Sequence, residues 1–250
     1  MKMSGWLKAL PFVLTLAAAV LMTVSCGSNS RPSNLAQIRV LNAVSDGPTL
    51  DIAVNGSKIF TALAFRDIQP ATTPVTYVNV GAGSAFMQGF STGSVVNPIA
   101  PIGTIQLTTS KQYTVIAVGP ELNDSPPLLV ADDNTPPMGS DVNIRMINAS
   151  PGSPIGGVDV YIVPPTVTDL TQYTPQVTAL GNAQPSTYVS LPYLAGGYNV
   201  IVTQAGFKSP ALITQPVAAN ASSITTLVIV DNLGGLNGMS TTPIVLNDLN

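Results

Sequence analysis

Apolar and polar residues alternate along this chain in short runs, which are separated by Gly, Pro and Asn. The pattern is clearest at residues 38–54 and 144–162. Each of these stretches holds an apolar run with one Arg, an Asn-Ala exit, a Pro/Gly turn and a second apolar run with one Asp. A period of two, bounded by turn residues, is typical of β-strands. The repetition therefore predicts two copies of one β domain.

Further strands are expected wherever Val, Ile, Thr and Tyr gather between turn residues. In the first copy they are residues 57–63, 74–80, 84–90, 102–108, 112–118 and 127–131. In the second copy they are residues 141–149, 158–163, 186–191, 198–204, 211–215, 224–230 and 243–246, and residues 164–183 form an insertion without a counterpart. No stretch after the leader shows a helical period. The expected fold is all-β, with two immunoglobulin-like or Greek-key sandwiches at 35–137 and 138–250, divided by the proline-containing segment 132–140.

The polar residues of the repeated motif are the candidate structural residues. They are one Arg, one Asn and one Asp in each copy: Arg39, Asn42, Asp51, Arg145, Asn148 and Asp159. If the first two strands of each copy form a hairpin, its Arg and Asp pair across the strands and fix the register. The Asn at each strand exit is expected to cap the following turn. A ligand-binding role for these residues is the alternative.

The motif Ile38-Arg39-Val40-Leu41-Asn42-Ala43, with its second copy at 144–149 and the downstream strand Tyr113-Thr114-Val115, resembles the DUF4397 family. That family is a domain of unknown function that is common in exported bacterial proteins, often in tandem. The second copy departs from the pattern at Gly156-Gly157, and 223–228 stands in place of the Tyr-Thr-Val strand. The resemblance implies a fold and an exported location, and it brings no activity.

The first 25 residues have the features of a signal peptide. Lys2 and Lys8 precede an apolar run at 10–24, which is shorter than a membrane-spanning helix and ends before Cys26, the only cysteine. Residues 23–26 resemble a lipoprotein lipobox, although Thr23 stands where Leu is usual. We therefore expect a lipid on Cys26, a tether at 26–34, and a protein anchored in the cell envelope, at the periplasmic or surface face of an outer membrane. An ordinary secretory signal is the alternative.

Composition narrows the classes of function. Charged residues make up 8% of the 250 residues and hydrophobic residues 45%, which is unlike a disordered chain. Removal of Lys2 and Lys8 with the leader leaves seven basic and twelve acidic residues, a net charge of −5. Without a basic patch, binding of nucleic acid is not expected.

The sequence lacks the residues that most common catalytic mechanisms need. The chain has no His, so catalysis by Ser-His-Asp or Cys-His groups is excluded, and we expect no metal and no cofactor. Residues 89–93 match G-x-S-x-G, but a nucleophile elbow needs a following helix and a His partner. Glu121, the only Glu, could act with Asp124 or with Asp132 and Asp133.

Aromatic residues offer one further candidate surface. Four tyrosines of the second copy could form a platform for a sugar, or they could serve as ordinary strand residues: Tyr173, Tyr188, Tyr193 and Tyr198. The leading hypothesis is a non-catalytic envelope lipoprotein that acts as a binding or spacer module, with an envelope protein or a glycan as its partner. The alternative is a carbohydrate-active or hydrolytic accessory protein that uses carboxylates near Glu121.

Overall fold

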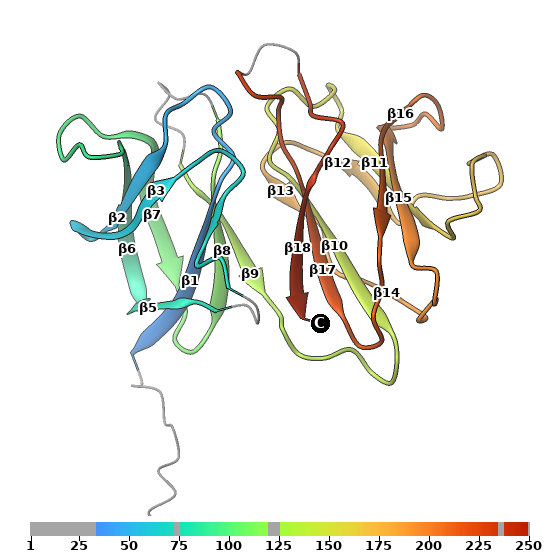
Figure 1. Cartoon of the computed structure of the whole chain (residues 1–250), viewed down its shortest axis with the longest axis horizontal. Helices are drawn as coiled ribbons and strands as arrows, with labels where there is room; N and C mark the ends of the chain where they lie inside the picture. The colour runs from blue at the N-terminus through green and yellow to red at the C-terminus, as the bar shows by residue number, and fades with distance from the viewer. Residues whose placement is uncertain (1–33, 73–75, 120–125, 235–237, 250) are drawn as a thin grey trace, which may run out of the picture. The chain divides into compact units, whose positions relative to one another are not determined.

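The computed structural model describes residues 34–72, 76–119, 126–234 and 238–249. Regular structure in these ranges is entirely β-strand, so they contain no helix that could cross a membrane. The strands form four sheets, which face each other in pairs as two sandwiches (Figure 1). The predicted all-β sandwich class is confirmed. Cys26, the leader and Glu121 lie outside the described residues.

The first sandwich contains β1 to β9. One sheet has the order β4-β1-β8-β9, with β5 also beside β1; its strands are β1 (Leu35–Asn42), β4 (Ile68–Gln69), β5 (Val78–Gly81), β8 (Gln112–Ala117) and β9 (Leu128–Asp132). The facing sheet has the order β3-β2-β6-β7; its strands are β2 (Leu50–Val54), β3 (Ser57–Leu63), β6 (Gly83–Ser91) and β7 (Ile99–Leu107). The pairing of β1 with β8 is parallel and places Arg39 opposite Thr114.

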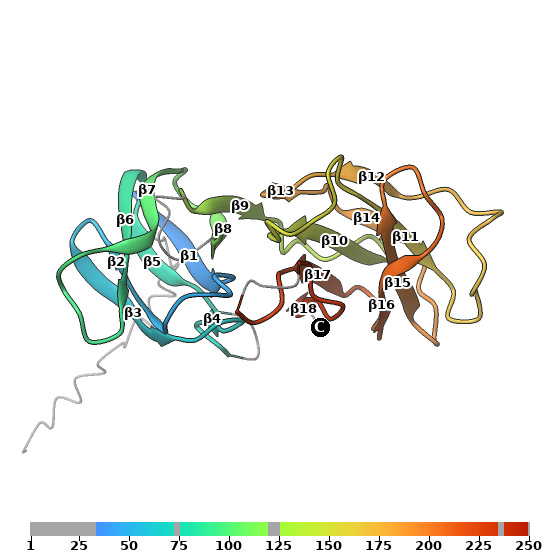
Figure 2. The same cartoon turned by 90° about the horizontal axis from the view of Figure 1, so that it is seen from above.

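The second sandwich repeats this topology strand for strand, and Figure 2 shows the strands of the two sandwiches from above. Its first sheet has the order β13-β10-β17-β18 with β14 beside β10; the strands are β10 (Val142–Asn148), β13 (Gln184–Pro185), β14 (Val189–Leu191), β17 (Ile224–Ile229) and β18 (Ile244–Leu249). Its facing sheet has the order β12-β11-β15-β16; the strands are β11 (Val158–Val163), β12 (Val177–Leu180), β15 (Tyr198–Gln204) and β16 (Ala211–Val217). β10 and β17 are parallel, as β1 and β8 are.

Strand alternation gives each sandwich its own core. Ile38 and Val40 of β1 pack with Ile52 of β2 in the first core, and Ile144 and Met146 take the equivalent places in the second. Successive side chains of a strand point to opposite faces. Leu41 and Ala43 therefore point away from this core, to the other face of their sheet.

That other face is buried too, because the two sandwiches pack against each other there. Leu41 and Ile116 of the first sandwich share an apolar cluster with Ile147, Val228 and Leu246 of the second. β1 and β10 are consequently buried on both faces over most of their length. The face of the β1 sheet that points away from its own core is thus buried in an interface between the two sandwiches.

Two expectations from the sequence are wrong. The first two strands of each copy do not form a hairpin, because β1 and β2 lie in facing sheets, as do β10 and β11. The segment 164–183 is not wholly an insertion, since it contains β12, which pairs with β11 as β3 pairs with β2. The turn-rich composition around β12 conceals this strand. β17 takes the place of the Tyr-Thr-Val strand without a change of topology.

Candidate functional site

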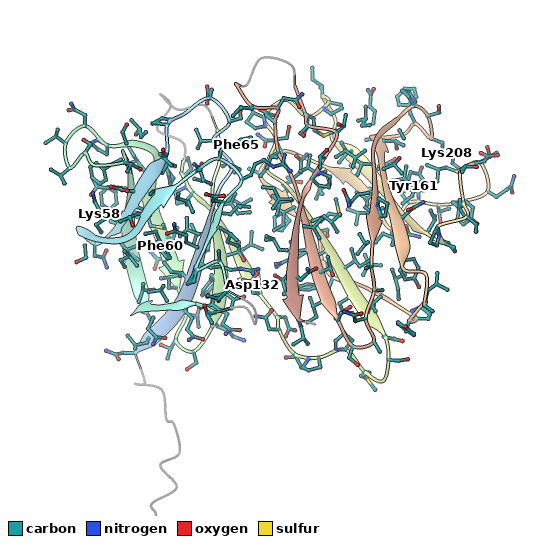
Figure 3. The ribbon with its side chains drawn as sticks, viewed as in Figure 1. Lys58, Phe60, Phe65, Asp132, Tyr161 and Lys208 are labelled. Atoms are coloured by element: carbon teal, nitrogen blue, oxygen red, sulfur yellow. The ribbon has the colours of Figure 1, made fainter. Side chains whose placement is uncertain are left out.

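Four charged side chains meet where the two sandwiches face each other. We call them the charge cluster: Arg39 on β1, Asp132 on β9, Arg145 on β10 and Asp248 on β18. Arg39 Nη2 donates to Asp248 Oδ1 at 2.5 Å, and Arg145 Nη2 donates to Asp132 Oδ1 at 2.7 Å. The side chains of both arginines are 2% exposed, and those of both aspartates 0%. Figure 3 shows Asp132 between the strands of the two sandwiches.

The charge cluster repeats the internal symmetry of the chain. Each Arg pairs most closely with the Asp of the other sandwich, at 2.5 and 2.7 Å, and less closely with a second Asp, at 3.6 Å for Arg39 with Asp132 and 3.8 Å for Arg145 with Asp248. The Arg of the first sandwich thus pairs with the Asp of the second, and the Arg of the second pairs with the Asp of the first. A two-fold interface between identical subunits has the same reciprocal arrangement.

A threonine on each parallel neighbour strand completes the cluster. Arg39 Nε donates to Thr114 Oγ1 at 2.7 Å, and that hydroxyl donates to Asp132 at 2.6 Å. In the second sandwich, the Nε of Arg145 donates to Thr226 Oγ1 at 3.1 Å, and that hydroxyl donates to Asp248 Oδ2 at 2.5 Å. Each threonine thus connects the Arg and the Asp of its own sandwich, while the ion pairs connect the two sandwiches.

Tyrosine rings cover the two guanidinium groups. The ring centroid of Tyr77 lies 5.4 Å from Cζ of Arg39, and that of Tyr188 lies 4.6 Å from Cζ of Arg145. Burial raises the pKa of Tyr188 to about 12, although the guanidinium of Arg145 acts in the opposite direction. Burial and then the carboxylate of Asp132 raise the pKa of Tyr77 as well. Both phenols therefore stay protonated at neutral pH, and Tyr77 donates to Asp132 at 3.0 Å.

The charges of the cluster are paired and almost fully buried. Burial lowers the pKa of Arg39, but the carboxylates of Asp248 and Asp132 outweigh this effect, so its pKa lies above the ordinary value. Two positive and two negative charges balance, and each is held by partners that leave it almost no access to solvent. A buried, mutually satisfied network positions the two sheets, although Arg39 and Asp132 each also line a surface pocket.

The predicted cross-strand pair of Arg39 with Asp51, and of Arg145 with Asp159, is wrong. In each sandwich the Arg and the Asp of the motif lie on facing sheets, and each Arg instead pairs with an Asp of the other sandwich. Asp51 instead accepts bonds from Lys58 Nζ at 2.6 Å and from the backbone N–H groups of Ala62 and Gly93.

Asp159 performs the same task in the second sandwich. It accepts the backbone N–H groups of Ala179 at 2.9 Å and Gly206 at 2.8 Å. Ala62 and Ala179 both have positive φ, of 53° and 48°, a conformation that costs free energy in a residue other than glycine. Each aspartate thus fastens a strained strand residue and a glycine turn, which is a structural role.

Asn42 and Asn148 occupy equivalent strand ends. Asn42 Oδ1 accepts the N–H of Val44 at 2.9 Å, and its Nδ2 donates to the carbonyl of Leu63 at 3.0 Å. Asn148 makes the corresponding bonds, with the N–H of Ser150 and the carbonyl of Leu180. Both side chains therefore cap the turn that follows their strand and join it to the facing sheet.

The other sequence candidates do not converge into a site. The G-x-S-x-G match at 89–93 lies at the end of β6 and is followed by a turn, and its last glycine donates to Asp51. Of the four tyrosines, Tyr188 covers Arg145, and Tyr198 is buried and donates to the carbonyl of Pro192. Tyr173 packs against the apolar cluster that contains Tyr161, and Tyr193 is exposed. They do not form one platform.

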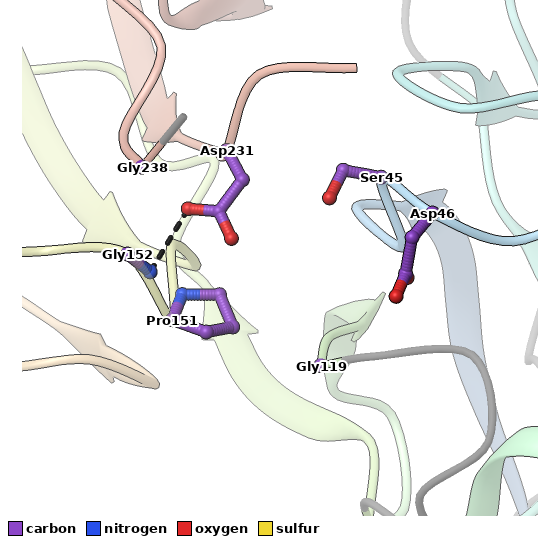
Figure 4. Close-up of a pocket in the computed structure, with 7 residues that line it drawn as sticks. All are labelled: Ser45, Asp46, Gly119, Pro151, Gly152, Asp231 and Gly238. Carbon is purple, nitrogen blue, oxygen red and sulfur yellow. Dashed lines mark hydrogen bonds between the residues drawn. The ribbon is translucent and has the colours of Figure 1, made fainter. Parts of the chain in front are cut away.

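A pocket opens near one end of the interface, where loops of both sandwiches meet (Figure 4). It has a volume of about 310 Å3 and is lined by Ser45, Asp46, Gly119, Pro151, Gly152, Asp231 and Gly238. Asp231 is 7% exposed and accepts the N–H of Gly152 at 3.0 Å and the hydroxyl of Ser150. Within the described ranges, no group of three or more His, Cys, Asp or Glu residues is placed to hold a metal.

Sequence reasoning missed half of the charge cluster. Asp132 falls in the segment expected to divide the domains, and Asp248 lies beyond the last expected strand. A signal existed, because each copy ends in an apolar strand that carries an Asp, as in Leu129-Val130-Ala131-Asp132 and Val245-Leu246-Asn247-Asp248.

Comparisons with known proteins add a family. The sequence model described as "Domain of unknown function (DUF4397)" matches residues 36–161. No curated protein matches the chain. Among solved structures, the chain is similar to CBMbc, a family 26 carbohydrate-binding module from Eubacterium rectale Amy13K in complex with maltoheptaose. The identity is 10%, the match covers 86% of this chain and 98% of that one, and the TM-score is 0.27, which is too low to support an argument.

Proposed function

The chain belongs to the DUF4397 family, a domain of unknown function, and from this premise we propose that it is a non-catalytic binding or spacer module of the cell envelope. Two copies of the family's sandwich form it, and a lipid on Cys26 holds it at the membrane. The single observation that carries the non-catalytic part is the charge cluster, in which Arg39, Asp132, Arg145 and Asp248 neutralise one another out of solvent.

The matching topology supports two copies of one domain. The family match at 36–161 covers the first sandwich and ends within β11 of the second. Nine strands of the second sandwich nevertheless follow the order of the first, and Arg145, Asn148 and Asp159 fall at the positions of Arg39, Asn42 and Asp51.

The lipid anchor rests on the sequence at 23–26. A lone Cys after an apolar leader has no disulfide partner, and residues 27–34 are rich in Ser, Asn and Gly, as a tether is. Two or more acyl chains would anchor the protein stably. We place it at the periplasmic or surface face of an outer membrane, where its partner is an envelope protein or a glycan.

Carboxylate chemistry near Glu121 has little support. Its two nearest candidate partners in sequence that the structure describes are otherwise engaged: Asp132 is bound in the charge cluster, and Asp133 Oδ1 accepts the N–H of Thr135 at 3.0 Å. The side-chain and backbone bonds to Thr135 hold the pKa of Asp133 below its ordinary value, so it is a poor general acid at neutral pH.

Two measurements test the proposal. Mass spectrometry of the mature N-terminus should find a lipidated Cys26, and Cys26→Ala should move the protein from the membrane to the soluble fraction. An unmodified N-terminus at another residue would contradict the anchor. Incubation of the purified chain with glycan, ester and peptide substrates should give no product, and turnover that Glu121→Gln abolishes would establish the enzymatic alternative.

A further inference from the structure

One loop distinguishes the second sandwich from the first. β2 and β3 are joined only by Asn55 and Gly56, whereas 13 residues, 164–176, connect β11 to β12. Apolar contacts hold this loop against the sheet, because Leu170 packs with Tyr161, Val163 and Ile201 on the face turned away from the core. Tyr161 is 2% exposed, although it points away from the core of its sandwich.

Polar contacts fix the loop at three points. Asn199 Nδ2 donates to the carbonyl of Pro165 at 3.2 Å, and Lys208 Nζ donates to the carbonyl of Thr171 at 2.7 Å. Gln176 Oε1 accepts the N–H of Ile162 at 2.6 Å. The loop is therefore fastened to β15, to the turn after β15 and to β11. Figure 3 shows Tyr161 and Lys208 in this part of the second sandwich.

The loop and the sheet line an open pocket that we call the loop pocket. Its volume is about 470 Å3, within the range of about 300–1,000 Å3 that small-ligand sites occupy. Leu170 and Ile201, each 5% exposed, supply buried apolar surface, and Thr168, Ser209 and Thr214 supply exposed hydroxyl groups. Among the described residues, no hydrogen bond engages these three hydroxyls.

The charges of the loop pocket balance. Its lining includes one carboxylate, Asp169, and one ammonium group, Lys208. Bonds from the side chain and backbone of Thr171 lower the pKa of Asp169, which is therefore ionised at neutral pH. One Lys208 hydrogen is used on the loop carbonyl, which leaves two for a ligand. The lining as a whole therefore carries no net charge.

We propose that the loop pocket binds a neutral polyhydroxylated ligand, namely a short segment of an uncharged glycan. The partly exposed side chain of Val167 and the exposed side chain of Ala211 offer apolar surface to the C–H groups of a sugar ring, and the free hydroxyls and the ammonium group suit its hydroxyls. This inference rests on the proposed function, because it names the ligand class of a binding module.

A peptide that adds a strand to the sheet fits less well. β16 is the edge strand next to the loop pocket, and an added strand needs backbone N–H groups along such an edge. Pro210 precedes β16, and Pro216 lies within it. Neither has an N–H group, and prolines are a common means of protecting an edge from strand addition.

The first sandwich provides a matched control. Strand registers place Gln88 at the position of Ile201 and therefore Ile102 at that of Thr214, and Thr104 is an exposed threonine two residues further along the same edge strand, β7. No loop of comparable length follows β2. A tryptophan at Thr214 would fill the loop pocket, whereas the same change at Thr104 would alter an exposed edge strand without touching that pocket.

The test is saturation-transfer NMR and calorimetric titration of the mature protein with maltohexaose, cellohexaose, xylohexaose and chitohexaose, with heparin and spermine as charged probes. We expect binding of at least one neutral hexasaccharide, weakened at least tenfold by Thr214→Trp and unchanged by Thr104→Trp. If Thr214→Trp lowers the melting temperature, Ala211→Trp replaces it as the variant that blocks the pocket, because Ala211 is also an exposed residue of the pocket wall.

Three results would overturn the inference: no binding of any neutral hexasaccharide, preferential binding of heparin or spermine, or equal binding by the Thr214→Trp and Thr104→Trp proteins. In each of these cases the non-catalytic envelope module stands. Its own failure would be recognised separately, by cleavage of a hexasaccharide or by an unlipidated mature N-terminus.

Discussion

Arg39 and Asp248 are 209 positions apart in the chain, yet their side chains meet at 2.5 Å in the interior of the protein. Arg39 lies on the first strand and Asp248 on the last, so this contact ties the two ends of the described chain together. Its symmetric counterpart joins Arg145 to Asp132 at 2.7 Å. The two sandwiches thus behave toward each other as identical subunits of a two-fold dimer do.

Removal of one member of the charge cluster should destabilise the whole protein. Arg145→Met leaves Asp132 buried without its closest cation, and a broken buried pair costs about 3–5 kcal/mol. Urea unfolding followed by circular dichroism measures the change in the free energy of unfolding. Asp67→Asn, at an exposed carboxylate that accepts one bond of 3.3 Å, is the control and should change it by less than about 0.5 kcal/mol. Similar values for the two variants would contradict the role of the cluster.

A double-mutant cycle distinguishes the observed pairing from the one that the sequence suggests. Arg39→Met and Asp248→Asn should be coupled by about 0.5–3 kcal/mol, because their side chains are in contact. Arg39→Met and Asp51→Asn should be additive to within about 0.5 kcal/mol, because the two lie on facing sheets with different partners. Coupling of Arg39 with Asp51 alone would restore the hairpin hypothesis.

Removal of either capping asparagine should destabilise the protein. Asn42→Ala leaves the carbonyl of Leu63 and the N–H of Val44 without their side-chain partner. Asn148→Ala does the same to the carbonyl of Leu180 and the N–H of Ser150. Each buried group left unsatisfied costs about 1–3 kcal/mol. Thermal unfolding should show a loss for both variants, the larger one for Asn148→Ala because Ser153 Oγ also donates to Asn148 Oδ1, and a loss for one variant alone would show that the equivalence is only topological.

Stability should fall at alkaline pH. Burial raises the pKa of Tyr188 from 10.0 to about 12, so the unfolded chain loses this proton first as the pH rises. The contribution to stability is complete below pH 10 and is lost between about pH 10 and 12. Free energies of unfolding measured across this interval should fall less steeply for Tyr188→Phe, which lacks the hydroxyl. Equal slopes would show that the phenol is not buried as described.

Local pattern was enough to locate most strands. The ranges of β3, β11 and β15 agree with the prediction, because their apolar residues alternate between clear turn signals. β4, β12 and β13 were not predicted as separate strands. These are short strands of two to four residues next to Gly, Pro or Gln, and pairing with a neighbour defines them better than their own composition does.

Pairing across the chain could not be read from the same pattern. Alternation placed Arg39 and Leu41 on one face of their strand correctly, but it could not show that a second sandwich covers that face. The parallel pairing of β1 with β8 joins segments separated by about 75 residues, and no local turn specifies it. The hairpin hypothesis failed for this reason, because nearness in sequence was taken for nearness in space.

Differential scanning calorimetry of the mature chain tests most directly whether the charge cluster and the shared apolar face join the two sandwiches into one module. The account predicts a single transition whose calorimetric and van't Hoff enthalpies agree, and which Arg145→Met shifts as a whole to lower temperature. Two resolved transitions, of which Arg145→Met moves only one, would contradict it.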